Sequence, residues 1–280
     1  IILIIYFKFL ISMDYKMKFI FADNITPEQM QFYDEHGFIH YKKFFTPEQI
    51  NGALKAVETL QSEWISQKLE KVNGIPIKYG KDENGNPIIQ RFAFASLHSE
   101  YLHNLVMDER IDKLRHFIGE DARIAENEKD GLVVSHYVNT GEESTFSRLG
   151  WHTDGLRDLF TQFTLNPMLN IGIYIDDSPI EKGGLRLLDG THKQGIFRML
   201  FRKKYFVDNE ADKDEVALEA EAGDLTVHSG RIWHRAALAS VQGTASKRRV
   251  MYFPIIKGKY QPKSSESRTP FYHKFHRLLK

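Results

Sequence analysis

The chain has 280 residues, 38 of them basic and 37 acidic, with a formal net charge of +1 and no cysteine. Near-neutral charge gives no global field toward nucleic acid or an anionic membrane, and the lack of cysteine excludes disulfides, thiolate metal sites and a cysteine nucleophile. We therefore expect a cytoplasmic protein with no nucleic-acid partner and no stable membrane association. The oligomeric state stays open, and any metal must be held by His, Asp or Glu.

The N-terminus is an apolar run, residues 1–11, that contains Lys8. A membrane-spanning helix needs about twenty apolar residues, and the run lacks the basic start and cleavage site of a signal peptide. We predict that residues 1–16 are a non-native or disordered extension, with Met13 or Met17 as the natural first residue. A membrane anchor is the alternative.

Two copies of the tetrapeptide Thr-Pro-Glu-Gln, at 26–29 and 46–49, predict helix starts with Thr as the N-cap and Pro at the first helical position. The first helix should end at Gly37 and lead into a strand at 38–41. The second continues through apolar residues at helical spacing, and residues 99–119 return to the same periodicity. Residues 73–86, rich in Gly, Asn and charge, predict an exposed hairpin or loop.

After Gly119 the chain changes to short apolar runs bounded by turn residues. The runs span 132–138, 169–175, 185–188, 216–220, 225–228 and 250–256. Their spacing favours a β-sandwich or barrel over alternating βαβ units. We predict one domain over residues 17–280, with a helical part at about 26–119, a β core at about 120–256 and a peripheral C-terminal tail.

A long insertion separates two of these strands. Residues 197–206 mix basic and aromatic side chains and predict an amphipathic lid, whose basic residues could alternatively hold a coenzyme A phosphate. The acidic stretch 208–215 after it should be solvated. Long insertions in compact domains are often functional.

The strongest chemical signal is Trp151-His152-Thr153-Asp154. On an extended strand, His152 and Asp154 would project from the same face and converge on one point. A third donor must come from elsewhere, and the segment after Gly223-Asp224 offers His228 and His234. Two histidines and one carboxylate, with coordination positions left open, are the arrangement typical of non-haem iron(II) oxygenases.

The order of these motifs resembles that of the phytanoyl-CoA dioxygenase (PhyH) family of iron(II)- and 2-oxoglutarate-dependent oxygenases, over about residues 25–256. The resemblance rests on Glu35-His36-Gly37-Phe38 in the opening part, on the His-x-Asp motif, on residues 183–193 and on the late histidines. It implies a mostly β fold with flanking helices and a double-stranded β-helix core of the jelly-roll or cupin type.

The resemblance also implies the ligands. His152 and Asp154 would be the first two, and the family's spacing after Gly-Asp selects His234 as the third, with His228 close by and not bonded. The family places an arginine for the distal carboxylate of 2-oxoglutarate on the next strand. The connection is about three residues longer here, so both Arg248 and Arg249 remain candidates, with Arg248 favoured.

For several other residues two interpretations remain open. His136, Tyr137 and Thr153 match positions near the co-substrate, with core packing as the alternative for the first two. Arg157 could meet an anionic substrate or form a surface ion pair. Core packing is the safer interpretation of Asn170 and Tyr174, and His192 is expected to be structural.

The implied activity is that of a dioxygenase that uses Fe(II), 2-oxoglutarate and O2 to hydroxylate or otherwise oxidise a C–H bond of a small organic substrate, with release of succinate and CO2. Asp154 occupies the position that halogenating relatives leave open, which favours hydroxylation. Two other functions stay open: a non-catalytic β-barrel binding or sensor protein that retains the metal pocket, and a cupin-like zinc enzyme without a 2-oxo acid.

Overall fold

The computed structural model describes residues 18–141, 146–162 and 165–270. The predictions made for residues 1–16 and for the last ten residues of the C-terminal tail lie outside this part of the chain.

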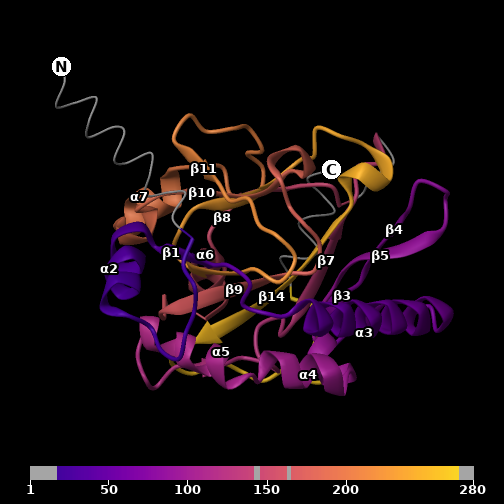
Figure 1. Ribbon diagram of the computed structural model, residues 1–280, viewed down its shortest axis with the longest axis horizontal. Coiled ribbons are helices and arrows are strands. Elements are labelled where there is room, and N and C mark those ends of the chain that lie inside the picture. The colour runs from indigo at the N-terminus through magenta and orange to yellow at the C-terminus, as the bar shows by residue number, and fades with distance from the viewer. Residues whose placement is uncertain (1–17, 142–145, 163–164, 271–280) are drawn as a thin grey trace.

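Two antiparallel sheets form the core of the described chain (Figure 1). The larger has the order β1-β12-β9-β14-β7-β5-β4, with β6 paired to β14, and the smaller has the order β11-β10-β13-β8. A separate hairpin pairs β2 with β3. The strands are β1 (Phe38–Tyr41), β2 (Lys71–Val72), β3 (Ile75–Pro76), β4 (Lys78–Lys81), β5 (Pro87–Phe92), β6 (Arg123–Ile124), β7 (Val133–Tyr137), β8 (Leu149–His152), β9 (Met168–Tyr174), β10 (Gly184–Leu188), β11 (Glu215–Ala217), β12 (Leu225–Ser229), β13 (His234–Ala237) and β14 (Arg248–Ile256).

Alternation along the strands divides the larger sheet into two faces. The outer face carries apolar residues such as Ile171, Ile173, Met251 and Phe253, which join one large core cluster with the helices. The inner face carries their neighbours, among them Asn170 and His228, which are paired across β9 and β12. The predicted mostly β fold with flanking helices is confirmed, and both of its core sheets are antiparallel.

The helices are α2 (Pro27–His36), α3 (Pro47–Ser66), α4 (Glu100–Val106), α5 (Glu109–Lys113), α6 (Asp154–Gln162) and α7 (Ile196–Phe201), with 3-10 turns at Ala95–His98, Leu114–Phe117, Ile180–Lys182, Thr191–Lys193 and Gly243–Ser246. Apolar residues of α2 to α5 join the core cluster on the outer face, whereas α6 and α7 contribute to a second cluster with Trp151 and Trp233. In Figure 1, α3, α4 and α5 lie together along one side of the molecule. The repeated Thr-Pro-Glu-Gln segments form the predicted capping boxes, and Gly37 ends α2 with φ +79°.

The helical stretch predicted over 99–119 is divided into three pieces. Met107 leaves the helical conformation, and the Asp108 carboxylate caps the next helix by accepting a hydrogen bond from the Arg110 amide. A local cap thus overrides the continuous apolar periodicity.

The strand predicted over 216–220 is found at Glu215–Ala217.

The prediction that His152 and Asp154 share one strand is wrong. Strand β8 ends at His152, and Asp154 is the first residue of α6, with Thr153 between them as the helix cap. The sequence analysis missed α6, β8 as a complete element and β13. Each of β8 and β13 is only four residues long and polar at its functional end, so neither gives an apolar run.

The insertion after β10 forms helix α7 over only part of the predicted lid. Phe197 and Phe201 are mostly exposed, whereas Met199 is buried against Trp151 and Trp233. The acidic stretch that follows is paired and not merely solvated, because Lys203 contacts Asp212 at 2.7 Å. Among the described helices, none has the length and apolar character needed to cross a bilayer.

Candidate metal centre

His152, Asp154 and His234 form the one group of potential metal ligands within the described residues, with their donor atoms all within 4.8 Å of one another. His152 ends β8 and His234 begins β13, and the two residues are paired directly across the smaller sheet. Asp154 reaches them from the first turn of α6. The turn at Thr153 therefore achieves the convergence that a continuous strand was expected to provide.

Hydrogen bonds to the backbone orient both imidazoles. The Nδ1 of His152 lies 2.8 Å from the Gly150 carbonyl, and the Nδ1 of His234 lies 3.1 Å from the Ile232 carbonyl. A carbonyl can only accept, so each Nδ1 carries the proton and donates it. In a neutral ring with this tautomer, Nε2 keeps the lone pair that can bind a metal ion, and Nε2 of His234 lies 3.8 Å from an Asp154 oxygen.

The protonation states also suit a cation. Burial lowers the pKa of His152 to about 3, and the charge of His234 adds to this effect. Burial alone would raise the pKa of Asp154, but the imidazoles of His234, His152 and His228 hold it well below its usual range. At neutral pH His152 is therefore neutral and Asp154 is ionised, which are the forms that bind a metal ion.

Asn170 contacts the carboxylate directly, a contact that the sequence analysis assigned to core packing. Its Nδ2 donates to Oδ2 of Asp154 at 2.9 Å from the inner face of β9. No hydrogen-bond donor of the described residues meets the other carboxylate oxygen, so the amide distinguishes the two oxygens. The signal in the sequence was the register, since Asn170 and His228 are cross-strand neighbours.

His228 lies beside the cluster without completing it. Its ring is 4.6 Å from that of His234, and its Nε2 is 3.9 Å from Oδ2 of Asp154. The residue is 1% exposed, and neither ring nitrogen has a hydrogen-bond partner within the described residues. Burial lowers its pKa well below the ordinary value. It is a neutral ring next to the three-residue group.

The segment after α7 closes one side of the site, which the sequence analysis did not foresee in residue detail. Phe206 stacks on His152 with ring centroids 4.5 Å apart, and its amide donates to the Trp151 carbonyl. Tyr205 donates its hydroxyl proton to the Thr153 carbonyl at 2.8 Å. The aromatic residues predicted as a lid thus pack directly on the motif.

The two candidate arginines on β14 point to opposite faces of the larger sheet. Arg249 is held outside by Asp176, through Nε and Nη2, and by Glu58. Arg248 is 1% exposed; its Nε donates to the Lys182 carbonyl, and its Nη2 has no partner among the described residues. Its guanidinium lies 3.9 Å from the centre of the Tyr137 ring. Arg248 and Tyr137 are therefore the pair on the inner face.

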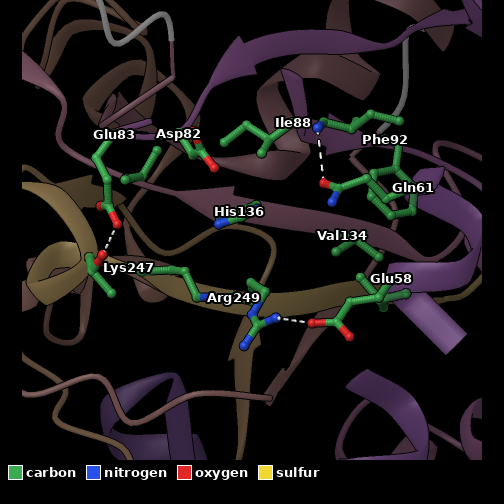
Figure 2. A pocket seen from close by; sticks show the side chains of 14 residues that line it. Glu58, Gln61, Asp82, Glu83, Ile88, Phe92, Val134, His136, Lys247 and Arg249 are labelled. Carbon is green, nitrogen blue, oxygen red and sulfur yellow. Dashed lines mark hydrogen bonds and ion pairs between the residues drawn. The ribbon is translucent and has the colours of Figure 1, made fainter. Parts of the chain in front are cut away.

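The structure does not bring His136 to this group, because it precedes Tyr137 on β7 and faces the other way. It lines a cavity of about 200 Å³ on the outer side, between α3, the β4–β5 hairpin and β14 (Figure 2). Figure 2 shows it among Glu58, Asp82, Glu83 and Arg249.

Thr153, predicted to lie near the co-substrate, uses its hydroxyl as the cap of α6, where it accepts a hydrogen bond from the Leu156 amide at 3.3 Å.

His192 lies apart from the three-residue group. Its Nε2 is 3.1 Å from the Asp34 carbonyl, and its ring packs where a side chain on Gly37 would otherwise be. This position links the turn after β10 to the end of α2.

The sequence model described as "Phytanoyl-CoA dioxygenase (PhyH)" matches residues 33–240, well over half of the chain. The chain belongs to the phytanoyl-CoA dioxygenase family. The matched span contains all three candidate metal ligands, His152, Asp154 and His234, and ends before Arg248.

A probable alpha-ketoglutarate-dependent hypophosphite dioxygenase of Stutzerimonas stutzeri is 26% identical over 178 residues, which are 61% of this chain and 54% of that protein. The chain thus spans about half the length of this curated relative. Among solved structures, the alpha-ketoglutarate-dependent carbocyclase SnoK from nogalamycin biosynthesis is 18% identical, with a TM-score of 0.59 over 90% of this chain and 91% of its own. HygX from Streptomyces hygroscopicus, with nickel and 2-oxoglutarate bound, is 16% identical, with a TM-score of 0.58 over 83% and 87%. These likenesses show the jelly-roll fold.

Proposed function

We propose that the protein is an Fe(II)- and 2-oxoglutarate-dependent dioxygenase that hydroxylates, or otherwise oxidises, a C–H bond of a small organic substrate and releases succinate and CO2. The observation that carries the proposal is the convergence of His152, Asp154 and His234 on one point within a PhyH-family fold. A cytoplasmic location and the absence of a nucleic-acid partner belong to the same proposal.

The three side chains fit a divalent iron ion. Two imidazole ligands and one carboxylate would leave a bound iron(II) ion a single positive charge and open positions for a 2-oxo acid and O2. Bound there with 2-oxoglutarate, the iron would supply the oxidation of the C–H bond by O2. The chain's own residues hold the ligands: the Gly150 and Ile232 carbonyls orient the two imidazoles, and Asn170 orients the carboxylate.

Arg248 is the residue that we propose for the distal carboxylate of 2-oxoglutarate. It is buried on the inner face, and its Nη2 is unpaired in the described chain, as expected for a donor that awaits an anionic group. A planar guanidinium can bind a carboxylate through two parallel hydrogen bonds. Tyr137, in contact with the guanidinium, would fix the plane in which this carboxylate lies.

Aromatic residues around His152 and Asp154 exclude water from the site. Phe206 covers one face of His152, and Trp151 and Trp233 are fully buried behind α7. A dry, pre-oriented site favours oxidation of the bound substrate over side reactions.

Succinate formation tests the function. The purified protein is incubated with Fe(II) and 2-oxoglutarate under air, and succinate is quantified for the wild type and for His152→Ala, Asp154→Ala and His192→Ala. We expect His192→Ala to retain succinate formation and the other two to lose it by more than about 100-fold, because loss of a ligand exceeds the usual effect of disturbing its supporting groups. Full turnover in His152→Ala would overturn the proposal. Binding of iron and 2-oxoglutarate without succinate would favour a non-catalytic binding protein.

A further inference from the structure

Two arginines from different parts of the fold share one carboxylate oxygen beside the metal centre. Arg91 Nη2 donates to Oδ2 of Asp130 at 2.9 Å, and Arg157 Nη1 donates to the same oxygen at 3.0 Å. Lys263 approaches the other oxygen of Asp130 at 3.6 Å. Asp130 itself is buried. Three cationic side chains thus surround one acidic side chain.

The register of the larger sheet puts Arg91 on its inner face. Arg91 is paired with Ser135, Ser135 with Val250, and Val250 with Tyr174, and directly paired residues share a face. The charge of Arg91 acts on inner-face Tyr137, where, together with that of Arg248, it opposes the rise in pKa that burial causes. Arg91 therefore belongs to the same interior as the proposed 2-oxoglutarate arginine.

Arg157 ties this cluster to the metal ligands. It lies three residues after Asp154 in α6, so both side chains are on the same side of the helix. Its charge is one of those that lower the pKa values of Asp154 and His152. The cluster is thus adjacent to the three-residue group and not a remote surface ion pair.

Three cationic side chains, those of Arg91, Arg157 and Lys263, approach the carboxylate of Asp130. The neighbouring Lys129 is separately paired with Asp158 at 2.5 Å. Moreover, Nη1 of Arg91 is buried and has no hydrogen-bond partner in the described chain, an arrangement that is costly unless a ligand or water meets it.

We propose that Arg91 and Arg157 form a subsite for an anionic group of the substrate, a carboxylate or a phosphorus oxoanion, held next to the metal centre. Asp130 positions the two guanidinium groups and partly neutralises their positive charge. This inference rests on the proposed function and adds the substrate class. The Arg91 guanidinium, whose buried Nη1 has no hydrogen-bond partner among the described residues, suits either anion, since both present two oxygens to a planar donor.

The test uses the iron-loaded protein saturated with 2-oxoglutarate under argon, so that Arg248 is already occupied. Calorimetry measures binding of methylphosphonate, of propionate and of the neutral propionamide. Arg91→Gln and Arg157→Gln should weaken binding of at least one anion by about tenfold or more, consistent with loss of one hydrogen bond to a charged group. Arg115→Gln, which removes an arginine paired with Asp112 on the helical side, should have no effect. The anion that binds more tightly identifies the class of the substrate's acidic group.

Asp130→Asn provides the opposite change. Removal of the only acidic side chain in the described part of the cluster should tighten anion binding if the subsite exists, whereas a purely structural role predicts lower thermal stability without tighter binding. Equal affinity of both anions for wild type, Arg91→Gln and Arg157→Gln, or binding of propionamide as tightly as propionate, would overturn the inference. If 2-oxoglutarate itself fails to bind, the proposed function fails, and the same probe titrations without it still decide whether the arginines bind anions.

Discussion

Asn170 donates from its amide to Oδ2 of Asp154 at 2.9 Å, across the space between the larger sheet and α6. We predict that Asn170→Ala weakens binding of a divalent metal by about 10- to 100-fold, because the carboxylate loses the donor that fixes its orientation. Calorimetric titration with Co(II), which avoids oxidation, measures the change.

The matched control is Asn51→Ala, an exposed asparagine on α3. Its metal affinity should equal that of the wild type. Unchanged affinity in Asn170→Ala would mean that the amide only fills space, as the sequence analysis assumed.

Gly150 allows the segment after α7 to approach the motif. A Cβ at this position would lie 2.5 Å from the Phe206 carbonyl oxygen and 2.8 Å from that of Asp208, both backbone atoms that cannot simply rotate away. Gly150→Ala should therefore lower the melting temperature and the metal affinity together. Gly195→Ala is the control, since nothing lies within 4 Å of its Cβ position and its φ is −66°. Equal melting temperatures for the two variants would show that the segment is not held in this way.

The two neighbouring arginines of β14 should separate two effects. Arg248→Gln should abolish measurable binding of 2-oxoglutarate while changing stability little. Arg249→Gln should keep that binding but lower the free energy of unfolding by about 2 kcal/mol, since it breaks a charge-assisted pair with Asp176. Anaerobic 2-oxoglutarate titration and urea unfolding of both variants provide the measurements. Loss of 2-oxoglutarate binding in Arg249→Gln alone would reverse the assignment.

His136 should make stability depend on pH. Burial and then the charges of Arg249 and Lys247 lower its pKa from 6.5 to about 4, with Asp176 and Asp82 opposing. Between pH 6.5 and pH 4 the unfolded chain binds more protons than the folded one. The free energy of unfolding is therefore highest above pH 6.5 and decreases as the pH falls toward 4. The loss attributable to this group between pH 7 and pH 5 is about 2 kcal/mol. Urea unfolding of wild type and His136→Gln at both pH values measures it, and identical pH dependence in the two would refute the account.

The sequence predicted the fold where local signals and core packing agree. The structure contains the predicted capping boxes at Thr26 and Thr46, and it contains the predicted strands β7, β9, β12 and β14. Each of these elements depends on a short sequence pattern that tertiary contacts reinforce. The turn at Thr153 did not, since the motif is compatible with both an extended strand and a strand that ends in a helix cap. Only the pairing of β8 with β13 and the position of α6 distinguish the two.

The site was predictable as a set of residue types and less so as a set of contacts. The faces of Arg248 and Arg249 follow from the register of β14, which a lengthened connection obscured in the sequence. Asn170 and Phe206 could not be assigned, because each meets its partner only through the fold. Arg91 precedes the predicted β core in the sequence and joins it only because β5 pairs with β7, where Arg91 lies opposite Ser135.

The most direct test of the central claim compares metal content in His234→Ala and His228→Ala. Both histidines are buried, neighbouring rings from adjacent parts of the chain, but only His234 belongs to the three-residue group. Iron bound per chain is measured after anaerobic reconstitution and desalting. We predict about one iron per chain in the wild type and in His228→Ala, and essentially none in His234→Ala. Retention of iron by His234→Ala together with its loss in His228→Ala would contradict the assignment.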